Sequence, residues 1–150
     1  RYARRRLALA TLRCHDDAIP AGEAYLFHAT SGDAACVIAT YDFNVARSCA
    51  LGLYGKAVSF AEMCSKSDEY VEPDEDGLCT ILIGRVLLGR VLNCTDVAPD
   101  TLKLEAAIDT GEYDSVIGDR TQTKGTFREF MVYDDRQCYA EYIVRYRRKF

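Results

Sequence analysis

Apolar residues occur along this chain in short runs separated by polar turns. Runs rich in Tyr, Phe, Val and Ile predict β-strands, and they lie at residues 24–28, 57–60, 113–117, 127–133 and 138–147, with a longer β-rich stretch at 78–92. Because the long stretch does not alternate between apolar and polar positions, we expect both of its faces to be covered. Strands dominate the second half of the chain, which predicts an α+β domain built around antiparallel strands.

The predicted helices are few and short. Residues 7–13 are apolar and compatible with a helix, and a break at Pro20-Ala21-Gly22 follows. Ser31-Gly32-Asp33 can cap a helix over residues 34–40, because a side-chain oxygen there can accept free amide protons. A third helix is expected at 61–70, before an acidic turn. The remaining stretches are expected to be irregular, and they are 41–54, 93–110 and 120–126.

Length and composition narrow the class of protein. The chain has 150 residues, of which 49% are hydrophobic and 28% charged, which fits one globular domain over residues 1–150 and excludes wholesale disorder. Charged residues and glycines interrupt the longest apolar stretch, 81–92, so it is too short to span a bilayer and we expect no membrane partner. No secretory signal is visible. Because residue 1 is an arginine, we expect a piece excised from a longer protein.

Charge and cysteine usage add two expectations. The net charge of −4 argues against a general nucleic-acid binder, although basic residues cluster at positions 1–6 and 145–149. These basic ends are either solvated faces or a contact to nucleic acid. The seven cysteines lie far apart, without the spacing of a zinc site or a disulfide scaffold. We therefore expect reduced thiols, several of them buried, in a nuclear or cytoplasmic protein, with a secreted effector as the alternative.

Two residues are candidates for chemistry. If 127–133 is a strand, alternation puts Glu129 on the same face as Phe127, Met131 and Tyr133. A carboxylate on an apolar face is costly unless it is paired or used, so Glu129 is a catalytic candidate, a sheet-edge residue or the partner of an arginine. His28 ends an aromatic strand and is either a site residue or a satisfied core histidine. No Ser-His-Asp order, histidine cluster or phosphate-binding glycine loop is present.

A series of local motifs extends this picture. In chain order they are Leu26-Phe27-His28-Ala29-Thr30, Asp42-Phe43-Asn44-Val45, Tyr54-Gly55-Lys56-Ala57-Val58-Ser59-Phe60-Ala61-Glu62, Ser65-Lys66-Ser67-Asp68-Glu69-Tyr70, Ile83-Gly84-Arg85-Val86-Leu87-Leu88-Gly89, Tyr113-Asp114-Ser115-Val116-Ile117 and Arg128-Glu129-Phe130-Met131-Val132-Tyr133-Asp134. Each motif alone is weak, but together and in this order they resemble the catalytic domain of the poly(ADP-ribose) polymerase family, the diphtheria-toxin-like ADP-ribosyltransferases. The resemblance covers about residues 23–148.

The resemblance implies a split antiparallel β-sandwich with short flanking helices, the ADP-ribosyltransferase fold. It also implies an extended cleft for NAD⁺ as co-substrate and no metal. His28 matches the histidine that holds a ribose 2′-hydroxyl, and Thr30 matches the hydroxyl residue that reaches the adenosine ribose. Ala29 stands where the family has a glycine whose backbone binds the nicotinamide carboxamide. Its Cβ would be strained if that site needs a positive φ.

The remaining matches surround the nicotinamide. Ser67 matches a serine that hydrogen-bonds the carboxamide, and Tyr70 matches a tyrosine stacked on the ring. Glu129 matches the glutamate that orients the ribose hydroxyls and activates the acceptor. Ser59, followed by Phe60 in the predicted wall of the cleft, replaces the family's signature tyrosine. The triad is therefore His28, Ser59 and Glu129 instead of histidine, tyrosine and glutamate.

The function that this resemblance implies is transfer of ADP-ribose from NAD⁺ to a protein acceptor, with release of nicotinamide. The stretch between Ile117 and Phe127 is short where polymerising members carry a long insertion, which favours mono-transfer and leaves chain elongation as an alternative. A catalytically silent domain that binds NAD⁺, ADP-ribose or a protein partner is the main rival hypothesis. It is motivated by Ser59, Ala29 and Ala57, the last standing where the family has a second glycine. A third hypothesis is hydrolysis of NAD⁺ in the same cleft.

Overall fold

The computed structural model describes residues 1–11, 22–49 and 52–149. In chain order its helices and strands are α1 (Tyr2–Thr11), β1 (Glu23–Ala29), α2 (Gly32–Tyr41), the 3₁₀ helix η2 (Val45–Arg47), β2 (Val58–Ala61), α3 (Cys64–Asp68), β3 (Cys79–Leu87), β4 (Val91–Cys94), α4 (Thr101–Asp109), β5 (Ser115–Asp119), α5 (Thr121–Lys124), β6 (Arg128–Val132), the 3₁₀ helix η3 (Asp135–Gln137) and β7 (Cys138–Tyr146). The predicted α+β class is confirmed.

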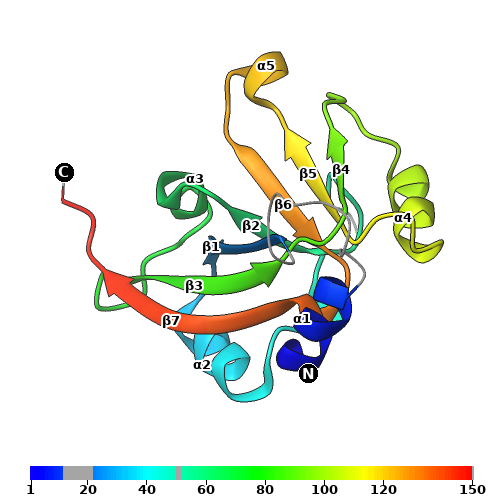
Figure 1. Cartoon of the computed structure of the whole chain (residues 1–150). Coiled ribbons are helices and arrows are strands. Elements are labelled where there is room, and N and C mark those ends of the chain that lie inside the picture. The colour runs from blue at the N-terminus through cyan, green and yellow to red at the C-terminus, as the bar shows by residue number, and fades with distance from the viewer. Residues whose placement is uncertain (12–21, 50–51, 150) are drawn as a thin grey trace.

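The seven strands form one sheet in the order β4-β5-β6-β2-β1-β3-β7. Neighbouring strands are antiparallel except for β4 and β5, which run parallel. The sheet is therefore mixed, whereas the sequence predicted antiparallel strands. β1 pairs with β3 along its whole length but meets β2 only at Phe27 and Ala61. Figure 1 shows the result: β5 and β6 run steeply, whereas β3 and β7 lie across the lower part of the molecule. The sheet is therefore split between β1 and β2.

Apolar side chains cover the two faces of the sheet in separate clusters. The largest cluster joins α2 to β1, β2, β3 and β6, with Leu82 and Val132 fully buried. A second cluster packs α4 against β5 and β6 through Leu104, Val116 and Met131. Because successive residues of β6 contribute to different clusters, both of its faces are covered along most of its length. The predicted coverage of both faces of β3 is also confirmed by its burial pattern.

Several predicted elements are found close to their expected positions, but the three stretches expected to be irregular each contain a short helix: η2 in 41–54, α4 in 93–110 and α5 in 120–126. Ser31 Oγ accepts the Ala34 amide at 3.2 Å and caps α2 as predicted. The region 93–110, expected to be irregular, contains α4, whose cap Asp100 accepts the amides of Leu102 and Lys103. Leu104 is the helix's one buried residue, so its apolar signal in the sequence is weak. The third expected helix, at 61–70, shortens to α3.

Two further boundaries differ from the prediction. The first helix begins at Tyr2, earlier than expected, and positions 12 and 13 lie outside the described residues. The stretch 78–92 divides into β3 and β4 around Gly89, which has φ +61. A Cβ at Gly89 would lie 2.4 Å from the Cβ of Asp114, so both the turn and the close approach require glycine.

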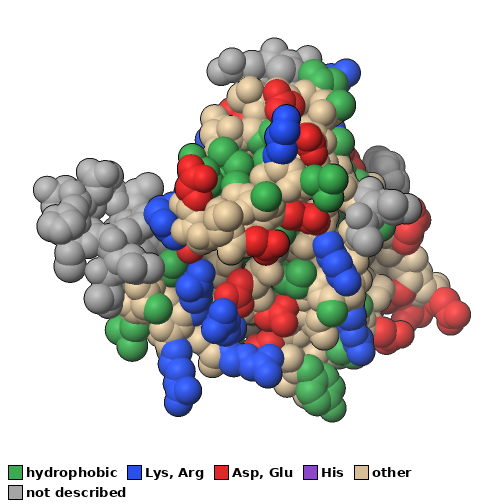
Figure 2. Space-filling model, turned by 90° about the vertical axis from the view of Figure 1, so that its right-hand side faces the viewer, with side chains coloured by type: hydrophobic (Ala, Val, Ile, Leu, Met, Phe, Trp, Pro, Cys, Tyr) green, Lys and Arg blue, Asp and Glu red, His purple; other side chains and the backbone are tan. Residues whose placement is uncertain are grey.

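The described cysteines are free thiols, three of them buried as small apolar side chains: Cys79, Cys94 and Cys138. The seventh, Cys14, lies outside the described residues. In Figure 2, basic side chains gather in the lower half of the face and acidic side chains lie among them. At the N-terminal end this mixing includes ion pairs from Arg5 to Asp114 at 3.1 Å and from Arg6 to Glu23 at 2.7 Å. These two arginines are thus engaged inside the domain.

Gly118 provides a test of the packing between β5 and the loop before β2. A Cβ at Gly118 would lie 2.1 Å from Cζ of Tyr54, whose side chain is buried and cannot swing away. Gly118→Ala should therefore cost about 1–3 kcal/mol through overpacking. The melting temperature should fall by roughly 2–4 °C per kcal/mol. Gly32→Ala is the matched control, because its nearest contact would be an ordinary 3.6 Å to Thr80 Oγ1. Equal melting temperatures for the two variants would contradict the described packing.

Candidate active site

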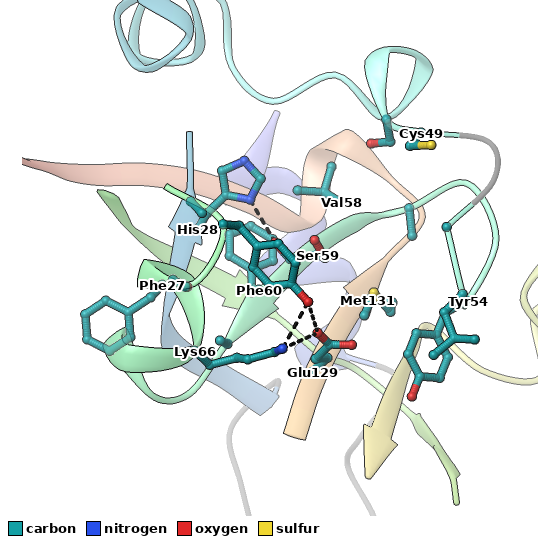
Figure 3. A pocket seen from close by; sticks show the side chains of 18 of the residues that line it. Phe27, His28, Cys49, Tyr54, Val58, Ser59, Phe60, Lys66, Glu129 and Met131 are labelled. Carbon is teal, nitrogen blue, oxygen red and sulfur yellow. Dashed lines mark hydrogen bonds and ion pairs between the residues drawn. The ribbon is translucent and has the colours of Figure 1, made fainter. Parts of the chain in front are cut away.

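A cavity of about 480 Å³ opens at the place where β1 and β2 diverge. Residues of β1, β2, α3 and β6 and of the loop before β2 surround it (Figure 3). Its lining contains Phe27, His28, Ala29, Ser48, Cys49, Gly52, Leu53, Tyr54, Gly55, Ala57, Val58, Ser59, Phe60, Ala61, Lys66, Ser67, Tyr70, Glu129 and Met131. The cavity thus collects every predicted site residue except Thr30.

Strand register explains why Glu129 faces this cavity. Ala61 of β2 pairs with Glu129 of β6, and Ser59 pairs with Met131, so these four side chains share one face. Ser59 is exposed between the buried Val58 and Phe60. β6 is an inner strand, so Glu129 is not at a sheet edge, which was one alternative from the sequence. The other alternative was pairing with an arginine, but the cation beside Glu129 is Lys66.

His28 stands on the opposite side of the cavity from Glu129, with Ser59 between them in Figure 3. Its Nδ1 lies 2.8 Å from the carbonyl oxygen of Ser59. Because a carbonyl only accepts, Nδ1 carries the proton and Nε2 is left as an acceptor. The ring also packs against Phe43 and Phe60, with centroids 5.3 and 5.4 Å away. Burial lowers the pKa of His28, and the bond to Ser59 opposes this shift only in part. The imidazole is therefore neutral at pH 7.

The Glu129 carboxylate belongs to a small polar network with residues of α3 and the turn after it. The Tyr70 hydroxyl donates to Oε1 at 3.3 Å, and Lys66 Nζ lies 3.7 Å from the same oxygen. Lys66 also donates to Glu69 at 2.8 Å and to the Tyr70 hydroxyl at 2.9 Å. Burial alone would lower the pKa of Lys66, but the hydrogen bonds to Glu69 and Tyr70 and the charge of Glu129 raise it above its usual value. Lys66 therefore remains an ammonium ion beside Glu129.

Lys66 was missed by the sequence reasoning. It stands in a Ser-Lys-Ser-Asp segment on a five-residue helix, where a lysine is ordinarily solvated. Its side chain is only 14% exposed here, because it reaches into the cavity toward β6. Nothing in the sequence brings residue 66 next to residue 129. Residues 66 and 129 come together because β2 pairs with β6 and α3 follows β2.

The other predicted residues occupy different parts of the site. Ser67 is buried in α3, and Tyr70 is exposed at the cavity mouth. Ala29 lies within β1 opposite Ile81 and does not have a positive φ, so its Cβ is not strained there. Phe60 is buried in the wall behind Ser59. Thr30 follows β1 directly and lines neither this cavity nor its neighbour.

A second cavity of about 330 Å³ adjoins the first. His28, Ser48 and Val58 line both, so the two spaces form one extended depression with the histidine at their junction. Arg47 lines the second cavity. Asp42 lines it too and has φ +69, the one positive φ of a non-glycine residue within the described segments. Such strained backbone is typical of functional loops.

Comparison with known families shows which family the chain belongs to. The family model described as Poly(ADP-ribose) polymerase catalytic domain matches residues 6–148. The chain belongs to this family. The match begins earlier than the motif resemblance and takes in half of α1. The α+β sheet split by a cleft agrees with the ADP-ribosyltransferase fold that the motifs implied. Family membership supports NAD-dependent ADP-ribosyltransferase activity in general, with NAD⁺ as substrate.

The described residues hold no cluster of three or more His, Cys, Asp or Glu side chains arranged for a metal ion. Within the same ranges, no helix has the length and apolar character needed to cross a membrane.

The neutral state of His28 predicts a pH dependence of stability. Because its folded-state pKa lies below the unfolded value of about 6.5, its contribution is fully present above that value. The contribution falls as the pH drops through 6.5 toward the folded pKa, by at most about 1.4 kcal/mol per pH unit for one proton. Urea unfolding between pH 7.5 and 5.5 should therefore show a smaller loss of stability for His28→Gln than for the native chain. Parallel pH curves would argue against a neutral histidine whose pKa is lowered by the fold.

Proposed function

We propose that this domain transfers a single ADP-ribose unit from NAD⁺ to a protein acceptor, with Glu129 as the catalytic carboxylate. The observation that carries the proposal is the position of Glu129 on the wall of the cavity, across from the neutral His28 and next to Lys66. A carboxylate so placed is available to a ligand in the cavity, which explains why it stands on an otherwise apolar face.

The two adjoining cavities fit an extended dinucleotide. The first is within the usual volume of small-molecule sites, and it combines apolar walls with a few polar groups. We assign the nicotinamide half to this first cavity, between Ser67 and Tyr70 of the α3 region and the backbone of Ala29. The second cavity continues past His28 and offers the Arg47 guanidinium to the diphosphate and adenosine half. Thr30, which lines neither cavity, is the least supported member of the proposed site.

Each residue receives a role that its chemistry permits. The free Nε2 of His28 accepts a hydrogen bond from a ribose hydroxyl, because its Nδ1 proton is committed to Ser59. Tyr70 presents an exposed ring for stacking on the nicotinamide and holds Glu129 through its hydroxyl. Lys66 keeps the Glu129 carboxylate oriented through a charge contact. Ser67 supplies a hydroxyl to the carboxamide.

NAD⁺ supplies a ribose whose bond to nicotinamide can break with departure of the neutral base. Positive charge then develops on the ribose, as in glycoside cleavage. The Glu129 carboxylate stabilises this charge electrostatically, and it accepts the proton that the acceptor side chain loses when its new bond forms. The walls of the cavity limit access of water, which strengthens both effects.

The preference for a single transfer rests on the connection between β5 and β6. It consists of residues 120–127 with the one-turn helix α5, and it enters the strand that carries Glu129. Such a short connection offers little surface beside the carboxylate for holding the end of a growing polymer.

The second candidate is a domain that binds NAD⁺ or ADP-ribose without catalysis. Ser59 favours it, because a small polar side chain stands in the cavity wall where the resembled family has a tyrosine. The Tyr70 and Lys66 contacts to one oxygen of Glu129 favour it too, since they compete with a ligand for that oxygen. Incubation with labelled NAD⁺ separates the two functions, because only the transferase places label on protein.

Glu129→Gln tests the catalytic assignment. The substitution preserves shape but removes the charge, so transfer of label should fall more than ~100-fold, a usual size for losing an electrostatic catalytic group. Binding of NAD⁺ should change little. Glu75→Gln, an exposed carboxylate outside both cavities, is the matched control and should transfer normally. Near-normal transfer by a folded Glu129→Gln protein would overturn the role given to Glu129.

Ser59→Tyr tests the open wall. Because Ser59 is exposed to the cavity, a tyrosine has room there and should form a second aromatic wall. An aromatic pair is worth about 1 kcal/mol, so NAD⁺ affinity should rise roughly fivefold with an unchanged melting temperature. Ser59→Leu fills similar space without a ring and should gain less. A lower melting temperature with no gain in affinity would show a remodelled wall and support the silent domain.

A further inference from the structure

The short helix α3 carries one side of the cavity but has little to hold it in place by itself. It spans five residues, and its first turn has no side-chain cap, since Met63 stands at the N-cap. Isolated helices of this length are unstable in water. Yet Lys66 and Ser67 of this helix, and Tyr70 just after it, all line the cavity. The position of these three side chains therefore depends on the contacts that α3 and the turn after it make with the rest of the fold.

One set of these contacts comes from the C-terminal end of the chain. Arg148 Nε donates to both carboxylate oxygens of Asp68, at 3.0 and 2.9 Å. Its terminal nitrogen donates to the carbonyl oxygens of Asp68 and of Val71, the latter at 2.9 Å. The Tyr146 hydroxyl also bonds to the Asp68 carboxylate. Figure 1 shows α3 and the end of β7 on the same side of the molecule.

This arrangement differs from an ordinary surface ion pair, which contributes little. The Arg148 guanidinium binds the backbone as well as the carboxylate, because it donates to the Asp68 carbonyl at the end of α3 and to the Val71 carbonyl after it. A cation at that end is also favoured by the helix dipole. Tyr146 belongs to β7, and Val71 is buried, so the contacts join α3 to a strand and to the core. The guanidinium therefore restrains both the position and the direction of α3.

We propose that Arg148, through Asp68, is a positioning residue for the nicotinamide side of the cleft. The set of contacts among Arg148, Tyr146, Asp68 and Val71 is called the C-terminal clamp below. The proposal rests on the proposed function, because it assigns that side of the cavity to nicotinamide. It also gives part of the basic C-terminal cluster an internal role.

The clamp should act on one half of the ligand only. His28 lies on β1, which is paired with β3 along its whole length and does not depend on α3 for its position. Ser67 and Tyr70 do depend on it. Loss of the clamp should thus weaken contacts to the nicotinamide and spare those to ADP-ribose. A change that merely destabilised the fold would lower the affinity for both ligands together.

The test compares Arg148→Met with Arg147→Met in the full chain. Arg147 is the adjacent exposed arginine, and no ion pair is found for it among the described residues, so it matches the loss of charge without touching α3. Calorimetric titration uses benzamide as a probe of the nicotinamide side and ADP-ribose as a probe of the other side. We expect Arg148→Met to lower the affinity for benzamide by about fivefold or more, because small misplacements of binding groups cause losses of this kind. ADP-ribose affinity should stay within about twofold in both variants.

Asp68→Asn and the double variant complete the design. If Arg148 acts through Asp68, the double variant should bind benzamide only slightly worse than Arg148→Met alone, because both substitutions break one set of contacts. Additive losses would overturn the clamp as the route. Equal weakening of benzamide and ADP-ribose, or unchanged affinity for both, would overturn it as well.

Hydrogen exchange separates failure of the clamp from failure of the proposed function. Arg148→Met should speed amide exchange over residues 64–71 relative to Arg147→Met, whether or not any ligand binds. Faster exchange in a chain whose native form binds neither probe would retain the clamp and overturn the nucleotide site. Unchanged exchange over these residues would overturn the clamp itself.

Discussion

The short backbone pairing between β1 and β2, limited to one pair of residues, is the constraint on which the site depends. Elsewhere in the sheet, neighbouring strands pair over four or more positions, but these two meet only at Phe27 and Ala61 and then diverge. Divergence in the middle of a sheet leaves side chains of both strands facing a common space, which is the larger cavity. The rest of the fold compensates for the lost pairing, because the largest apolar cluster joins side chains of β1 and β3 to side chains of β2 and β6 across the divergence. The opening can therefore persist without unfolding the sheet.

The same divergence determines the electrostatics of the site. Glu129 lies on a covered inner strand, yet its carboxylate reaches the opening because Ala61, its partner on β2, is small. The charge is balanced locally by Lys66 and the Tyr70 hydroxyl, both presented by the region of α3. On the far wall, burial lowers the pKa of His28, so the cleft combines a carboxyl group with an uncharged acceptor of hydrogen bonds. This separation of roles suits the proposed transfer, in which positive charge develops on the ribose next to the departing nicotinamide.

Arginines near the two ends of the chain bind acidic side chains elsewhere in the domain. The C-terminal Arg148 reaches α3, and the N-terminal Arg5 reaches Asp114 at the start of β5. The Asp114 carboxylate also accepts hydrogen bonds from the backbone amide and the guanidinium of Arg90, next to the tight turn at Gly89. The basic residues at the two ends of the chain thus include groups that fasten the domain together. The net negative charge of the chain is consistent with internal use of these cations.

Sequence by itself determined the α+β class, most of the strands and the cap of α2, because alternation, β-branched residues and Ser31 act locally. It also indicated Glu129 through its place on an apolar face, and the motif order indicated the family. It did not reveal α4, whose single buried leucine leaves almost no periodic signal, nor the parallel pairing of β4 with β5. Lys66 and the Arg148 contact to Asp68 were equally hidden, because they join residues 63 and 80 positions apart. Such contacts arise only when strand order brings distant segments together, so the tertiary structure alone decided which residues surround the carboxylate.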